Sequence, residues 1–121
     1  MAGEALFVGW GQVVRGREQL ALQVFQETIA FYTKLQDDGR IASFEATLLR
    51  PHGGDLAGFL LMRGEQSSLD SIAASEEFVR LVSRAGSVVD NVGVVQAYTG
   101  DALGRLMGIF GELAQELPQA K

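Results

Sequence analysis

The chain has 121 residues, 47% of them hydrophobic, and a formal net charge of −5. This length fits one domain, 1–121, and the composition is not that of a disordered chain. The acidic balance and the scattered Lys and Arg residues exclude the basic surface expected for nucleic-acid binding or for an anionic membrane. Without cysteine there is no disulfide, thiolate metal site or cysteine nucleophile. The start of the chain lacks a basic leader and no apolar run could span a bilayer, so we expect a cytoplasmic protein.

The first two predicted elements are a strand and a helix. Apolar residues alternate over 6–14, which predicts a strand, and recur with a period of 3.6 over 17–36, which predicts a helix. Gly39 follows directly and suits the left-handed position that ends a helix. The apolar stripe of the helix consists of Ala21, Val24, Phe25, Thr28, Tyr32 and Leu35.

Two further alternating stretches, 41–50 and 57–65, predict a pair of strands. They flank the turn-rich segment 51–55, so we expect a hairpin. Pro51 cannot donate a hydrogen bond to a strand ladder and marks the end of the pairing.

A turn centred on Gly54 would set the register of this hairpin. Residues whose numbers sum to 108 would then pair, placing Glu45 opposite Arg63 and Thr47 opposite Leu61. We therefore predict a charge pair on one face of the sheet.

The next helix, 68–85, is predicted to be broken. A serine cap at Ser67 or Ser68 begins it, and Ser75, followed by two glutamates, is a second helix-start signal within it. A last alternating stretch, 92–98, predicts the fourth strand.

An amphipathic helix is predicted at the end of the chain, over 101–117. Asp101 would cap its first turn and Pro118 would end it. We expect its apolar stripe to pack against the body or a second subunit, because an isolated helix of this length is marginal in water. The stripe consists of Leu103, Leu106, Met107, Phe110, Leu113 and Leu117.

The element order is therefore β-α-β-β-α-β with one added helix. This is the split βαβ, or ferredoxin-like, arrangement. The predicted fold class is α+β, with a four-stranded antiparallel sheet in a single domain.

Residues 58–65, followed by 69–78 and 81–86, resemble the second half of small dimeric α/β-barrel proteins. That superfamily includes antibiotic-biosynthesis-type monooxygenases, YCII-related proteins and many uncharacterised members. The resemblance implies a homodimer in which two ferredoxin-like sheets pack face to face around cavities. The early histidine of YCII-type proteins is missing here, because His52 is the only histidine, so a haem or YCII-type function has no residue to carry it.

Two other motifs are weak. His52 lies in a glycine-rich hairpin loop without a nucleophile elbow, so a solvated loop histidine is favoured over a catalytic one. Gly9, Trp10 and Gly11 lack the third glycine of a dinucleotide fingerprint and lie inside a strand. We expect no cofactor, and no metal site, since one histidine and no cysteine leave only carboxylates.

Polar side chains inside the predicted strands form the candidate site. One arrangement places them all on the sheet face that points away from the helices, where a mixed polar and apolar surface suits a ligand cavity. Alternatively, that face is merely solvated or covered by the last helix or a partner. The candidate ligand-binding residues are Trp10, Gln12, Glu45, Thr47, Arg63, Gln96 and Tyr98.

Three functions remain open from the sequence. The first is a binding protein that holds a small, partly apolar or aromatic molecule between the two sheets. The second is a cofactor-independent monooxygenase or isomerase, with Glu45 as general base and Gln12, Gln96 or Tyr98 orienting the substrate. The third is a structural dimer with a filled core. A guanidinium beside Glu45 would hold it as an anion and weaken it as a base, which favours binding over catalysis.

A homodimer is also predicted from surface chemistry. An apolar sheet face without helices is too large to remain in water, and a two-fold dimer buries the same face on both copies. The residues assigned to that face are Trp10, Leu49, Phe59, Leu61, Val92 and Val94.

Overall fold

The computed structural model describes residues 3–117, which form four strands and four helices. The strands are all antiparallel and lie in the order β2-β3-β1-β4, which confirms the predicted ferredoxin-like α+β fold. Within the described residues, no helix is both long and apolar enough to cross a membrane. The elements are β1 (Glu4–Trp10), α1 (Glu18–Asp37), β2 (Ser43–Leu48), β3 (Gly58–Arg63), α2 (Gln66–Ala74), α3 (Glu76–Ala85), β4 (Gly93–Tyr98) and α4 (Gly100–Glu116).

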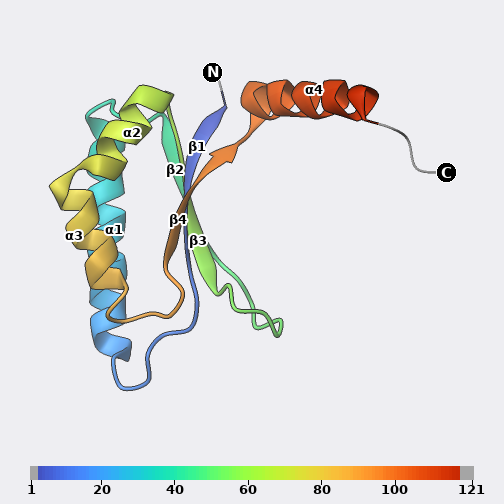
Figure 1. The fold of residues 1–121 in the computed structure, drawn as a ribbon. Coiled ribbons are helices and arrows are strands. Elements are labelled where there is room, and N and C mark those ends of the chain that lie inside the picture. The colour runs from blue at the N-terminus through green and yellow to red at the C-terminus, as the bar shows by residue number, and fades with distance from the viewer. Residues whose placement is uncertain (1–2, 118–121) are drawn as a thin grey trace.

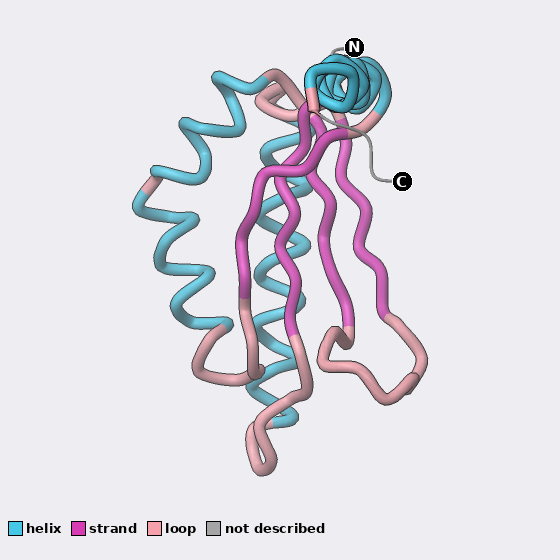
Figure 2. The backbone as a smooth tube through the Cα atoms, turned by 45° about the vertical axis from the view of Figure 1, so that its right-hand side comes forward, coloured by secondary structure: helices cyan, strands magenta, loops and turns pink. Residues whose placement is uncertain are grey.

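The sheet has two unlike faces. Helices α1, α2 and α3 lie against one face, and α4 leaves the end of β4 on the other side (Figures 1 and 2). We call the first the helix-covered face. The second, the open face, carries side chains at the intervening strand positions, which are Phe7, Glu45, Thr47, Phe59, Leu61, Arg63 and Val95.

The hydrophobic core lies between the sheet and the three helices. Strand residues such as Leu6, Val8 and Leu60 point into it, and Tyr32 and Ile72 meet them from the helices. Fully burying a side chain of this size contributes about 1.5–3 kcal/mol to stability. The alternation that predicted the strands is therefore the alternation between this core and the open face.

The predicted break in the second helical segment is confirmed at Ser75. Its backbone is extended, and its hydroxyl oxygen accepts a hydrogen bond from the Phe78 amide at 3.2 Å, which begins α3. The serine cap predicted for α2 is wrong: the helix begins at Gln66, so Ser67 and Ser68 lie inside its first turn. Gly39 has a φ of +75°, as expected after the end of α1.

The predicted hairpin register is wrong by two residues. Glu45 pairs with Leu61, and Arg63 pairs with Ser43. The reason is the loop, which closes around His52: one ring nitrogen accepts a hydrogen bond from the Gly54 amide, and the other lies 2.8 Å from the Leu56 carbonyl oxygen. A shift of two residues keeps every side chain on its face. The predicted pair therefore still forms diagonally, with 2.5 Å between Arg63 Nη1 and Glu45 Oε1.

The first strand is shorter than the predicted stretch 6–14. It ends at Trp10, and the Gly11 amide then donates a hydrogen bond to the Asp90 carbonyl at 2.6 Å. Further on, Val13 forms only an isolated bridge with Val89. The alternation of apolar and polar residues in the sequence continues beyond Trp10, although the chain leaves the sheet there.

The helix α4 forms as predicted but does not pack along its length on its own chain. It begins at Gly100 after Thr99, so Asp101 lies in the first turn and is not the cap. Ala102 is buried, whereas the larger apolar residues of the stripe are mostly exposed. The predicted stop at Pro118 lies outside the described residues.

Candidate functional site

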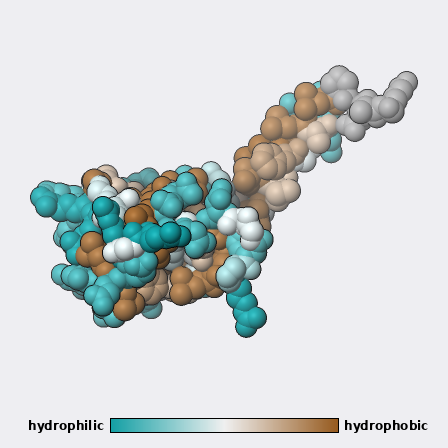
Figure 3. All heavy atoms as spheres, turned by 90° about the horizontal axis from the view of Figure 1, so that it is seen from below, coloured by the Kyte–Doolittle hydropathy of each residue, from teal (hydrophilic) through white to brown (hydrophobic). Residues whose placement is uncertain are grey.

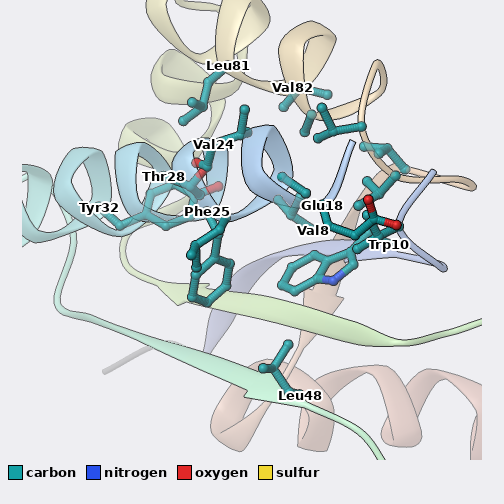
Figure 4. A pocket seen from close by; sticks show the side chains of 17 residues that line it. Val8, Trp10, Glu18, Val24, Phe25, Thr28, Tyr32, Leu48, Leu81 and Val82 are labelled. Carbon is teal, nitrogen blue, oxygen red and sulfur yellow. The ribbon is translucent and has the colours of Figure 1, made fainter. Parts of the chain in front are cut away.

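A cavity of about 370 Å³ opens between α1, α3 and the helix-covered face. Figure 4 shows side chains from all three converging on it. Its volume falls within the range of small-molecule sites, which are lined mainly by apolar groups. The residues that shape it include Val8, Trp10 and Leu48 of the sheet, Ala21, Val24, Phe25, Thr28 and Tyr32 of α1, and Leu81, Val82 and Ala85 of α3.

Two aromatic rings form one wall. Trp10, on β1, meets Phe25, on α1, edge to face, with 6.1 Å between the ring centroids and 68° between the planes. In Figure 4 both rings lie between α1 and the strands, with Leu48 of β2 opposite. Such a wall offers both a ring face and a ring edge to an aromatic guest.

Polar groups in the lining are few. The Glu18 carboxylate accepts a hydrogen bond from the Gly16 amide at 3.1 Å, and the Thr28 hydroxyl donates to the Val24 carbonyl at 2.7 Å. Burial raises the pKa of Tyr32, so its phenol is neutral and can donate a hydrogen bond. The lining suits a mainly apolar guest with one or two oxygens.

Small residues make room for the cavity. Ala21 on α1 and Ala85 on α3 both lie in the lining, where larger side chains would fill the space. Arg84 of α3 and Glu27 of α1 form an ion pair of 3.0 Å that ties the two helices together. The cavity therefore exists because the side chains of Ala21 and Ala85 are small, and the ion pair links the two helices that border it.

The predicted site residues are divided between the two faces of the sheet. Glu45, Thr47 and Arg63 lie on the open face, as expected. Glu45 is paired with Arg63, and 60% of its side chain is exposed, so the single chain does not provide the buried carboxylate that a general base there requires.

The prediction that all seven residues share one face is wrong. Gln96 pairs with Leu6, a core residue, so Gln96 and Tyr98 lie on the helix-covered face with Trp10. The Gln96 amide donates to Gln66 of α2 at 2.8 Å. Gln12 lies beyond the end of β1. Of the seven, Trp10 alone lines the cavity.

The apolar surface assigned to the dimer needs the same correction. Phe59 and Leu61 do lie on the open face. Val94 pairs with Val8, and Val92 lines the cavity, so both belong to the helix-covered side with Trp10. On the open face their place is taken by Phe7, whose ring stacks on that of Phe59 at 5.3 Å, and by Val95.

Sequence reasoning missed most of the cavity lining. The residues Ala21, Val24, Phe25, Thr28 and Tyr32 were identified, but only as the apolar stripe of a helix. The available signal was size: Ala21 begins that stripe, and Ala85 ends α3. Small residues on two facing helices leave space, but a sequence does not say that they face each other.

The acidic residues and His52 are the only side chains of this cysteine-free sequence that could supply a metal site of the ordinary kind. Within residues 3–117, no three such side chains come together in a way that could bind a metal ion. His52 is engaged in its own loop.

Comparisons with known proteins support the fold. No protein-family model matches this chain, and no curated protein sequence does. Its structure is similar to that of a dimeric protein of unknown function with a ferredoxin-like fold from Bacteroides fragilis NCTC 9343, with 13% identity, a TM-score of 0.56, and coverage of 80% of this chain and 97% of that one. A DABB family protein with a ferredoxin-like fold from Mesorhizobium loti MAFF303099 has 11% identity and a TM-score of 0.62, over 81% and 98% of the two chains.

An oxygenase has the same architecture. SnoaB, a cofactor-independent oxygenase from Streptomyces nogalater, is 20% identical, with a TM-score of 0.55, over 82% of this chain and 95% of its own. At such identities the similarity concerns the fold, since one fold hosts many functions. The predicted resemblance to dimeric ferredoxin-like proteins is confirmed at the level of the fold.

Proposed function

We propose that this protein is a homodimer that binds a small, mainly apolar or aromatic molecule in the cavity between α1, α3 and the sheet. The observation that carries this function is the 370 Å³ cavity and its apolar lining. The proposed ligand site therefore lies on the helix-covered side of one chain, and not between the sheets of two chains as the sequence suggested.

The chemistry of the lining defines the class of ligand. Trp10 and Phe25 favour a planar ring, and the protonated phenol of Tyr32 favours a hydrogen-bond acceptor such as a carbonyl oxygen. A charged ligand is disfavoured, because few polar groups would replace its water.

The open face supports the homodimer. Phe7, Phe59, Leu61 and Val95 place apolar groups on a surface that α1–α3 leave uncovered. Structurally similar proteins from Bacteroides fragilis and from Jannaschia sp. CCS1 are described as dimeric. Face-to-face packing of two copies would remove both apolar surfaces from water.

Ligand binding can be measured through Trp10, which is the single tryptophan of the chain and lines the cavity. We use 2-naphthol as the probe, because its absorption overlaps tryptophan emission. Saturable quenching of Trp10 is expected with the unmodified protein. Ala21→Phe should weaken it at least tenfold by filling the cavity, which corresponds to about 1.4 kcal/mol.

The matched control is Ala30→Phe, the same change at an exposed position of the same helix. It should leave quenching unchanged. Equal quenching in the Ala21→Phe protein, or quenching that never saturates, would contradict binding in this cavity.

A cofactor-independent monooxygenase or isomerase is the second candidate, favoured by the structural similarity to SnoaB. Oxygen uptake, or isomerisation of a compound shown to bind, would be measured without added cofactor. Glu45 lies on the open face, so Glu45→Gln should leave activity unchanged if chemistry occurs in the cavity, whereas Tyr32→Phe should reduce it. A structural dimer with a filled core is disfavoured by the empty volume in the protomer.

A further inference from the structure

The helix α4 is held in a set direction at its base. Both the amide and the hydroxyl of Thr99 donate hydrogen bonds to the Gly3 carbonyl oxygen, each at 2.8 Å. Ala102 is buried, and Arg105 forms an ion pair of 3.2 Å with the largely buried Glu4 of β1. These contacts join the first turns of α4 to the start of β1, so the direction of α4 relative to the sheet is fixed at its base.

Beyond that base, α4 exposes apolar side chains. Figure 3 shows it projecting from the body with hydrophobic residues along it. A 17-residue helix is marginal by itself in water, and a contiguous apolar stripe of this size usually marks an interaction site. The exposed fractions run from 45% to 55% for Leu103, Met107, Ile109, Phe110 and Leu113.

The direction of α4 indicates what covers this stripe. It extends on the side of the sheet opposite α1 and α3, beyond the open face (Figure 1). A second copy docked on the open face would therefore lie alongside α4. Each copy carries both surfaces, the open face and the stripe. In a two-fold dimer the stripe of each copy can therefore pack on the other copy, and no third protein is needed to cover it.

The surface area of α4 is too small for a dimer interface without the open face. A 17-residue helix is about 25 Å long and about 10 Å wide, so one side of it offers on the order of 250 Å². A stable interface buries about 800 Å² on each partner. The helix α4 alone is too small to hold a dimer, and the open face must supply the remainder.

We propose that α4 is an intersubunit arm whose apolar stripe packs on a second copy of this chain docked at the open face. The arm rests on the proposed homodimer and deepens it, and it is independent of ligand binding in the cavity.

A photo-reactive amino acid tests the contact directly. Benzoylphenylalanine is placed at Phe110, on the stripe, or as a matched control at Glu112, on the opposite side of the same helix turn. Equal amounts of ¹⁴N and ¹⁵N protein are mixed and irradiated. At position 110 we expect products that join light and heavy chains, and at position 112 at least fivefold fewer.

Sedimentation equilibrium provides the second measurement. Replacing Met107 and Phe110 by Lys should raise the dimer dissociation constant at least tenfold, whereas Glu112→Lys should leave it within twofold. Far-ultraviolet circular dichroism and thermal unfolding show whether each variant retains its folded body.

The outcomes separate the arm from the dimer. If the unmodified protein is a dimer, but position 110 links only to its own chain or the Lys variant dimerises equally well, the arm is refuted and the dimer stands. A protein that stays at 13 kDa up to about 100 μM, far above the dissociation constant of a stable dimer, refutes both. Neither result bears on the cavity.

Discussion

Leu60 and Leu61 are neighbours on β3 whose side chains point to opposite faces, so the same substitution at each should have different consequences. Leu60 is 1% exposed and packs in the core. Leu61 is half-buried on the open face, where it pairs with Phe7 and Glu45. Leu60→Ala removes core packing, and Leu61→Ala removes part of the proposed dimer interface.

The two substitutions should lower the free energy of unfolding by different amounts. Leu60→Ala should lower the free energy of unfolding by about 3 kcal/mol, the loss of transfer energy plus a residual cavity. For a chain of this size, that corresponds to a fall in Tm of roughly 12 °C. Leu61→Ala should lower the unfolding free energy of the monomer by only about 1 kcal/mol, because its side chain is already partly in water.

The difference should appear in the dependence on protein concentration. Thermal unfolding is followed by circular dichroism at about 1 μM and about 100 μM, since a dimer gains stability by mass action. The Tm of the Leu60→Ala protein should rise with concentration as steeply as that of the unmodified chain. The Tm of the Leu61→Ala protein should rise less. Equal losses and equal concentration dependence for both variants would refute the two-faced account of β3.

Three further predictions concern local interactions. Ser75→Ala should lower the free energy of unfolding by about 1 kcal/mol in urea titrations, because the Phe78 amide loses its capping oxygen, and Ser75→Asp should restore most of it. A double-mutant cycle on Glu45 and Arg63 should give a coupling energy of about 0.2–1 kcal/mol in a monomeric background, and a larger one in the dimer, where water is excluded. Burial raises the pKa of Tyr32 above its ordinary value. Its contribution to the free energy of unfolding should therefore be complete below about pH 10 and fall as the pH rises further. Urea titrations at several pH values should show this fall in the unmodified protein and a smaller one in the Tyr32→Phe protein.

The fold was predictable because local signals agree with it. The periods of the strands and helices, the turn glycine Gly39 and the helix start at Ser75 each depend on residues within a few positions. The end of β1 was predicted less accurately, because a hydrogen bond with a distant segment draws the chain out of the sheet. The Gly11 amide, for example, bonds to Asp90, which lies far along the sequence.

The candidate site was predicted less well, because alternation identifies which residues share a side but not which side the helices cover. For β2 and β3 the assignment was right, and Glu45 and Arg63 meet despite a register error of two. For β1 and β4 it was reversed, so Trp10 and Gln96 lie on the helix-covered face. The cavity itself depends on how α1 and α3 face each other, which no local pattern encodes.

The position of β1 in the sheet has a consequence for synthesis of the protein. Of the four strands, β1 is synthesised first, yet its two neighbours in the sheet are β3 and β4, and Glu4 pairs with Tyr98. Contacts between segments so far apart form late, because the intervening chain must first be closed into a loop. Until β4 has emerged from the ribosome, one edge of β1 remains unpaired. An unpaired strand edge is a template for pairing with other chains, so the sheet of this protein loses that hazard at β1 only when β4 is added.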